Sequence, residues 1–248
     1  MTAIVRDHGT SVDEIADGIY RINTPLDIPG GGFSFNQYLI VDDAPLLFHT
    51  GLRRIFPAVR TAITRVMPVE RLRYLAFAHF EADECGALND FLAAAPQAEP
   101  VCSRIAAMVS VNDVADRPAH ALGDGEVLTL GRHRLRWLDA PHLPHGWENG
   151  YMIEETTGTL LCGDLFTQPG SKSPAITEGD ILGPSEAFRH AMDYYAHCRD
   201  SSALFAKIAA THPRVLACMH GSAWHGDGEA LINALAKSVS AREPALSA

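Results

Sequence analysis

Four short apolar segments of this chain run directly into a loop that offers a histidine or an aspartate. The segments are residues 74–78, 136–140, 160–163 and 216–219, and the loops begin at His79, Pro141, Asp164 and His220. Short apolar runs that end at turn residues are typical of buried strands, and loops after strands often carry functional side chains. A chain that ends four strands in this way is expected to build one site from several loops at one edge of its sheets.

The first of these loops offers three possible metal ligands at alternate positions, His79, Glu81 and Asp83. A tight loop just past a strand end can point alternate side chains into one pocket, and an imidazole with two carboxylates suits iron or manganese. From Gly86 onward the apolar spacing is helical. An acidic, solvated start of this helix explains the same residues without a metal. The loop by itself therefore leaves a metal site and a helix start as alternatives.

The composition excludes several classes of protein. The chain has 248 residues and a formal net charge of −10, so it can bury a substantial core and lacks the basic surface that nucleic acids require. No apolar run approaches the roughly 20 residues of a membrane span, and the polar N-terminus has no secretory signal pattern. The five cysteines are odd in number and form no CxxC pair, which is typical of reduced thiols. We expect a cytoplasmic protein with no nucleic-acid or membrane partner.

Hydrophobic spacing predicts the elements of a single domain over residues 1–248, with its core at about residues 15–241. Strands are predicted at 19–22, 35–41, 45–49, 72–78, 99–102, 126–130, 134–138, 151–154, 159–162 and 215–219, and helices at 53–67, 85–95, 104–114, 184–198, 201–211 and 228–241. Residues 1–17 and 168–183 are expected to be irregular, and glycines 30–32 to form a flexible connection. Strands in two groups, with helices after several of them, predict a layered α/β (α+β) fold with two sheets between helices.

The order and spacing of the candidate ligands resemble the diiron site of flavodiiron and oxygen-binding diiron proteins, within the metallo-β-lactamase superfamily. The ligands in question are His79, Glu81, Asp83, His145, Asp164 and His220. Four further segments carry the resemblance, namely residues 35–40, 145–149, the paired-tyrosine helix at 194–196, and 219–224. The resemblance covers roughly residues 15–235. It implies an αββα metallo-β-lactamase-like sandwich with a two-metal site at the sheet edge.

The resemblance also implies a role for each ligand and two iron ions as the cofactor. His79, Glu81 and His145 would hold one metal, Asp83 and His220 the other, and Asp164 would bridge both. The hydrolytic branch of the superfamily usually has His at the position of Glu81. A carboxylate there lowers the preference for zinc and stabilises ferric iron. Zinc, manganese or a mixed pair are the alternatives.

Two positions depart from the family pattern. Glu84 stands where the hydrolytic branch has a further His and where flavodiiron relatives often have a non-ligating His. It is free to hydrogen-bond, to stay solvated or to coordinate. His49 stands where the superfamily commonly has Asp. It either donates a hydrogen bond to the site from behind the ligands or fills a polar gap.

Three other residues are candidates for proton donation. His142 competes with His145 as a ligand, and the alignment favours His145, which leaves His142 as a nearby proton donor. Tyr194 or Tyr195 can donate a proton or a hydrogen bond to bound oxygen, while aromatic core packing is the alternative for at least one of them.

The expected function is to bind or reduce O2 at a diiron centre, as a sensor or as an oxidoreductase. The chain has no flavodoxin-like segment after its last predicted helix, so electrons would come from an external redox partner, and relatives suggest a homodimer. A binuclear metallohydrolase acting on an ester, lactone or phosphodiester is the alternative. Oxygenation of an organic substrate, with glycines 30–32 and residues 168–183 lining its pocket, is a third possibility. A non-catalytic domain with an acidic surface is the fourth.

Overall fold

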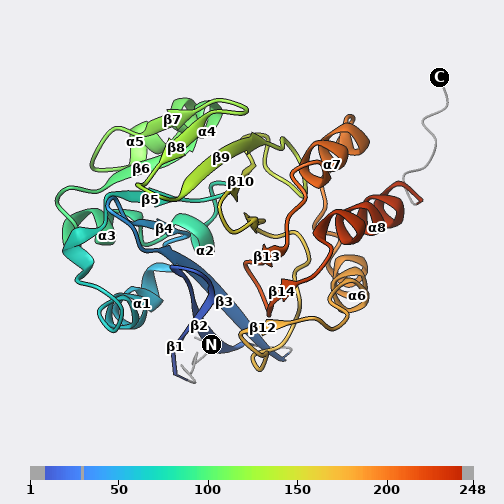
Figure 1. The fold of residues 1–248 in the computed structure, drawn as a ribbon, viewed down its shortest axis with the longest axis horizontal. Coiled ribbons are helices and arrows are strands. Elements are labelled where there is room, and N and C mark those ends of the chain that lie inside the picture. Colours follow the sequence, from blue (N-terminus) through green and yellow to red (C-terminus); the bar gives the residue numbers. More distant parts are fainter. Residues whose placement is uncertain (1–8, 29–30, 242–248) are drawn as a thin grey trace, which may run out of the picture.

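Two seven-stranded sheets form the centre of the computed structural model, which describes residues 9–28 and 31–241 (Figure 1). The first sheet contains, in spatial order, β1 (Ser11–Ala16), β2 (Ile19–Ile28), β3 (Gly31–Ile40), β4 (Leu46–Phe48), β5 (Tyr74–Ala76), β6 (Glu99–Ser103) and β7 (His120–Leu122). The second contains β12 (Ile176–Thr177), β14 (Ala223–His225), β13 (Val215–Ala217), β11 (Thr159–Leu161), β10 (Gly150–Glu154), β9 (Arg134–Asp139) and β8 (Val127–Thr129). Both sheets mix parallel and antiparallel pairs.

The α-helices are α1 (Phe56–Ile63), α2 (Ala82–Cys85), α3 (Leu88–Ala94), α4 (Arg104–Ala106), α5 (Asn112–Val114), α6 (Leu182–Met192), α7 (Ser201–Ala209) and α8 (Gly228–Ser240). Short 3-10 turns cover Arg53–Ile55 and Val69–Arg71, and a π-helical turn covers Ala107–Val111.

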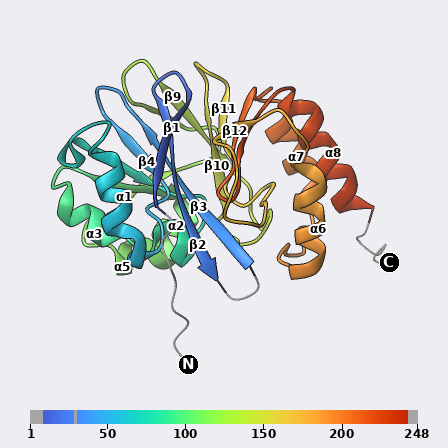
Figure 2. The same ribbon diagram turned by 90° about the horizontal axis from the view of Figure 1, so that it is seen from below.

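The sheets lie between two layers of helices. Figure 2 shows α1, α3 and α5 on the outer side of the first sheet, and α6, α7 and α8 on the outer side of the second. One hydrophobic cluster joins Phe48 and Trp137 of the two sheets to Phe205 of α7, and a second joins Leu75 of the first sheet to Phe91 of α3. The predicted αββα sandwich is therefore confirmed.

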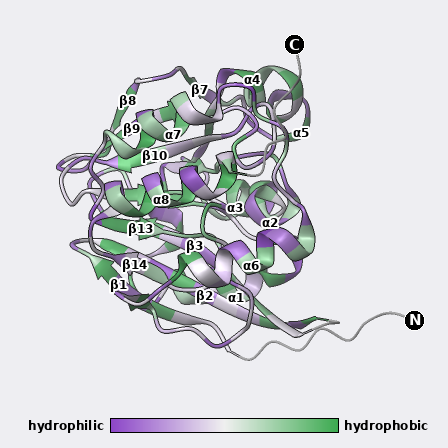
Figure 3. Ribbon diagram, turned by 90° about the vertical axis from the view of Figure 1, so that its right-hand side faces the viewer, coloured by the Kyte–Doolittle hydropathy of each residue, from purple (hydrophilic) through white to green (hydrophobic). Residues whose placement is uncertain are grey.

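The covering helices are amphipathic and short. In α8 the buried residues include Ile232, Leu235 and Val239, and Figure 3 shows hydrophilic and hydrophobic residues along the same helix. Apolar residues on one face of a helix bury that face against a sheet and leave the opposite face in contact with water. None of the helices in the described parts of the chain has both the length and the apolar character needed to cross a membrane.

The strand directions bring the predicted loops to a common edge. Strands β11 and β13 are parallel, with Leu161 opposite Ala217. Strand β9 runs in the same direction, because both β9 and β11 pair antiparallel with β10. Parallel strands end at the same edge of a sheet, so the loops after β9, β11 and β13 leave the second sheet together. The prediction of loops gathered at one edge is confirmed for these three strands.

The predicted helix over residues 184–198 is wrong in its second half. Helix α6 ends at Met192, and Asp193 adopts a left-handed conformation with φ 51°. This conformation stops a right-handed helix. Tyr194 and Tyr195 therefore lie in an irregular segment, and the expected paired-tyrosine helix is not formed.

Two further predictions are wrong because packing overrides local pattern. Residues 11–16 form β1, an edge strand in which only Ile15 is buried, so its apolar signal is weak. Gly31 and Gly32 belong to β3 instead of a flexible connection, while Gly30 lies outside the described residues. A Cβ added to Gly32 would meet the Ser171 side chain at 2.2 Å, so glycine there permits the close approach of the 168–183 loop.

Candidate metal centre

The polar residues at the strand ends converge on one place between the two sheets. His79 follows β5, His145 lies in the loop after β9, Asp164 follows β11 and His220 follows β13. Glu81 caps the start of α2 with an extended backbone, which carries the chain from the strand end into the helix. Four segments that are distant in the sequence thus contribute side chains to one cluster.

The first part of the cluster contains His79, Glu81, His145 and Asp164. Their ligand atoms all lie within 4.8 Å of one another. The Nε2 atoms of His79 and His145 are 3.0 Å apart, and the carboxylate of Glu81 lies 3.5 Å from the first and 3.3 Å from the second. Asp164 Oδ2 lies 3.4 Å from His145 Nε2. These four atoms surround a common centre.

The second part of the cluster shares Asp164 with the first. His220 Nε2 lies 3.3 Å from Asp164 Oδ1 and 3.4 Å from Asp83 Oδ2. The two oxygens of Asp164 therefore face two different groups, since Oδ2 faces His145 and Oδ1 faces His220. This is the arrangement that a carboxylate bridging two metal ions requires.

The donor set fits a pair of transition-metal ions. Ligand atoms about 2.1 Å from a tetrahedral metal lie about 3.4 Å from each other, which matches the separations in this cluster. Asp164 is buried, and among the described residues its Oδ1 has no hydrogen-bond partner. The Nδ1 atom of His220 lies 2.8 Å from the Ser34 carbonyl oxygen. A carbonyl accepts only, so Nδ1 carries a proton, and Nε2 is the nitrogen that can bind a metal ion once its own proton is lost.

The carboxylates control the charge of the imidazoles. Burial lowers the histidine pKa values, but Glu84 and neighbouring carboxylates outweigh burial and raise the pKa of His79 to about 12. For His220 burial is outweighed by Asp164 and Asp83, and the pKa rises to about 10. Burial raises the pKa of Asp164, yet the contacts with His220 and the other histidines lower it to about 2. The cluster attracts cations, and a metal ion would replace the protons on these histidines.

A small pocket of about 160 Å³ opens onto the cluster. Its lining combines cluster residues with Phe33, Thr167, Phe188 and Tyr194. The rings of Phe33 and Phe188 stack at 5.7 Å, and the ring of Phe33 lies 4.4 Å from that of His220. The pocket has room for several water molecules or for a small ligand. Sequence analysis missed both phenylalanines, because nothing in their spacing sets them apart from core residues.

Glu84 and His49, the two residues that depart from the family pattern, are in contact with each other. Glu84 is fully buried and accepts the backbone N–H of His79 at 2.7 Å. Its Oε1 lies 3.1 Å from His79 Nδ1 and 3.3 Å from Nε2 of His49, which is also fully buried. Of the three possibilities for Glu84, hydrogen bonding describes its position, and a solvated position is excluded.

The tyrosines and His142 occupy three different environments. Tyr194 lines the pocket, and its hydroxyl lies 3.4 Å from the Asp164 carbonyl oxygen. The ring of Tyr195 packs against Tyr194 at 5.0 Å and beneath the Arg189 guanidinium, and its buried hydroxyl has no hydrogen-bond partner among the described residues. Tyr195 thus has the packing role that was the alternative for one tyrosine.

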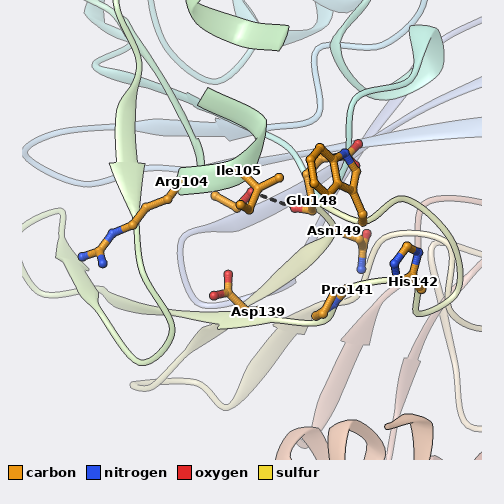
Figure 4. Close-up of a pocket in the computed structure, with 9 residues that line it drawn as sticks. Arg104, Ile105, Asp139, Pro141, His142, Glu148 and Asn149 are labelled. Atoms are coloured by element: carbon orange, nitrogen blue, oxygen red, sulfur yellow. Dashed lines mark hydrogen bonds between the residues drawn. The ribbon is translucent and has the colours of Figure 1, made fainter. Parts of the chain in front are cut away.

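His142 does not line the pocket beside the cluster. It lines a separate cavity of about 290 Å³ together with Asp139, Pro141 and Trp147 (Figure 4). Its backbone is left-handed, with φ 63°, and its N–H donates to the Gly146 carbonyl oxygen. The role of His142 as a proton donor stays a prediction.

Comparison with known proteins identifies relatives of this chain. Residues 33–221 match the family model described as ODP family beta lactamase. The nitric oxide reductase of Moorella thermoacetica is 24% identical over 242 residues, which are 90% of this chain and 60% of the relative. The rubredoxin-oxygen oxidoreductase of Megalodesulfovibrio gigas is 26% identical over 171 residues, which are 67% of this chain and 41% of the relative. This chain matches about 60% or less of the length of these relatives.

Solved structures share the architecture. The rubredoxin oxygen:oxidoreductase of Desulfovibrio gigas superposes with a TM-score of 0.76 at 22% identity, covering 93% of this chain and 61% of that one. A flavodiiron core from Synechocystis superposes with a TM-score of 0.80 at 19% identity, covering 94% of this chain and 61% of that one. At these identities the superpositions show a common fold. With its match over residues 33–221, the chain belongs to the ODP family of beta lactamases, metallo-β-lactamase-like domains homologous to the corresponding part of flavodiiron proteins.

Proposed function

We propose that this domain holds two iron ions and reduces O2, or a similarly small diatomic molecule, with electrons from an external donor. The observation that carries the proposal is the position of Asp164, whose two oxygens face two groups of ligand atoms. Two relatives are named as a nitric oxide reductase and a rubredoxin-oxygen oxidoreductase, which supports this class of substrate.

The proposed ligand assignment gives each ion both nitrogen and oxygen donors. His79, Glu81 and His145 hold the first ion, Asp83 and His220 hold the second, and Asp164 bridges them. Three imidazoles with three carboxylates form a harder and more negative donor set than an all-histidine site, which favours iron over zinc. Two ferrous ions, when bound, would supply two electrons, and the external donor would supply the other two that reduction of O2 to water requires.

The pocket supports a small and apolar substrate. At about 160 Å³ it admits a diatomic molecule. Phe33 and Phe188 stack on each other beside the cluster and make part of the pocket wall apolar. An apolar wall of this kind suits an uncharged diatomic molecule.

Tyr194 is the proposed proton-holding group of the pocket. Burial raises the pKa of its hydroxyl, so the group keeps its proton at neutral pH. The hydroxyl lies beside the Asp164 carbonyl oxygen, at the wall of the pocket. The hydroxyl donates to that carbonyl over 3.4 Å, and rotation about its C–O bond would let it donate instead to a small molecule in the pocket.

Oxygen uptake tests the proposal. The protein is loaded anaerobically with ferrous iron and mixed with air-saturated buffer in an oxygen electrode. Photoreduced flavin serves as the electron donor. Catalytic O2 consumption that follows iron content is expected, and zinc-loaded protein is the matched control. Equal consumption by both forms, or ester hydrolysis by the zinc form alone, would overturn the assignment. The homodimer, the cytoplasmic location and the single-domain organisation stay predictions.

A further inference from the structure

The buried side of His79 faces a carboxylate and a second histidine. Glu84 and His49 are each 0% exposed and His79 is 1% exposed. Glu84 Oε1 lies between the two imidazoles, 3.1 Å from His79 Nδ1 and 3.3 Å from His49 Nε2. The three side chains thus form a row that runs from the cluster into the core.

The backbone fixes this row from both ends. His49 has φ 65°, a left-handed conformation that is rare for a residue with a side chain. Its N–H donates to the Ala76 carbonyl oxygen at 2.7 Å, and Thr50 N–H donates to the Glu84 carbonyl oxygen at 2.6 Å. The segment that carries His49 is therefore joined to the strand before His79 and to the helix that carries Glu84. Strain of this kind persists only where the surrounding contacts impose it.

We propose that His49 and Glu84 form one acid–imidazole pair that positions His79. Glu84 Oε1 lies within 3.3 Å of a nitrogen of each imidazole, and all three side chains are almost completely buried.

The chemical consequence concerns His79. A buried carboxylate needs hydrogen-bond donors. Glu84 Oε2 accepts the backbone N–H of His79, and Oε1 lies 3.1 Å from His79 Nδ1 and 3.3 Å from His49 Nε2, two nitrogens with no hydrogen-bond partner among the described residues. A proton held on His79 Nδ1 by this carboxylate would leave the lone pair of Nε2 for the cluster. Carboxylates that hold a ligating histidine in this way typically change metal affinity about 10- to 100-fold when they are removed. His49 and Glu84 are positioning residues, and the inference rests on the proposed ligand role of His79.

Zinc binding tests the positioning role without redox chemistry. Zinc affinity is measured in competition with a chromophoric chelator for wild type, Glu84→Ala and Glu84→Gln. We expect zinc affinity to fall about 10- to 100-fold in Glu84→Ala and less in Glu84→Gln, whose amide oxygen can still accept a hydrogen bond. Glu154→Gln is the matched control, because Glu154 is equally buried but accepts from the backbone N–H groups of Thr156, Thr157 and Arg134, none of which belongs to the cluster. Equal affinities for the Glu84 variants and the control would overturn the proposal.

A spectroscopic measurement separates positioning from general stability. In zinc-loaded protein, the ring N–H proton of His79 should exchange slowly with water, since it is buried against Glu84. Exchange followed by NMR should become at least tenfold faster in Glu84→Ala and stay slow in Glu154→Gln. An unchanged exchange rate in Glu84→Ala would contradict the contact. Because zinc supplies no redox chemistry, these results are independent of O2 reduction, so the proposed function can fail while this inference holds.

A double-mutant cycle tests the pairing of His49 with Glu84. Urea unfolding of metal-free protein is compared for His49→Asp, Glu84→His and the double variant. His49→Asp places two buried acids side by side, and Glu84→His places two imidazoles side by side. The double variant restores one acid and one imidazole. We expect the unfolding midpoint of the double variant to lie above that of both singles. If either single variant does not fold, the milder His49→Gln and Glu84→Gln cycle replaces it. Additive losses would overturn the pairing.

Discussion

Metal loading of this centre is expected to release protons, and the number follows from its histidines. In the metal-free cluster the carboxylates raise the pKa of His79 to about 12 and that of His220 to about 10. Both imidazoles are therefore protonated at about pH 8, and each must lose a proton before its Nε2 can bind a cation. Loading both positions should release at least two protons per chain. Each released proton makes the apparent metal affinity rise about tenfold per pH unit. With two protons, the overall affinity for two metal ions should rise about 100-fold per pH unit below about pH 10.

Calorimetry in buffers of different ionisation enthalpy measures this proton release directly. Zinc titrated into metal-free protein serves as the probe, since it reports on the ligands without redox changes. Glu84→Gln is the matched variant, because it removes the carboxylate that raises the pKa of His79 most and takes away no proposed metal ligand, so it should reduce the proton count. Metal binding that releases no protons and does not depend on pH would refute the reasoning.

The same groups set the pH dependence of stability in the metal-free protein. The pKa values of His79 and His220 in the folded state exceed the unfolded value of about 6.5. Their contribution to stability is therefore fully present below about pH 6.5 and is lost as the pH rises towards about 10 and 12. Metal-loaded protein should show the opposite trend, since deprotonation favours metal binding. Urea unfolding midpoints of the two forms across this range check the sign.

Three further predictions concern single side chains. Asp164→Ala should lower bound metal from two ions to one or none per chain by elemental analysis, whereas retention of two would contradict its bridging position. Phe33→Ala should open the pocket beside His220 and speed metal loss to a chelator several-fold, and an unchanged rate would show that the ring does not cover the cluster. Tyr195→Phe should leave the free energy of unfolding within about 1 kcal/mol of wild type or raise it, because the hydroxyl is buried without a partner among the described residues. A larger loss in urea unfolding would reveal a hydrogen bond at that hydroxyl.

Sequence reasoning reached the fold and the cluster because both depend on short-range signals. Apolar runs such as residues 215–219 predict buried strands, and the polar residue that follows each run marks the sheet edge. Parallel pairing of β11 and β13 then brings Asp164 and His220 together. The sandwich follows from two groups of strands with helices after several of them. These features need no knowledge of side-chain contacts.

The remaining features depend on contacts that the sequence does not encode locally. His142 and His145 are three residues apart, and the left-handed turn at His142 decides which of them reaches the cluster. Phe33 and Phe188 are distant in the sequence and meet only over the pocket. The same holds for His49 and Glu84, which the sequence presents as two unrelated departures and the fold brings within 3.3 Å of each other.

The metal content of the protein tests the central claim most directly. Cells are grown with both iron and zinc available, and the purified protein is analysed for both metals per chain. The account predicts two iron ions per chain and an absorption change when the reduced protein meets O2. Stoichiometric zinc, with no spectral response to O2, would contradict it.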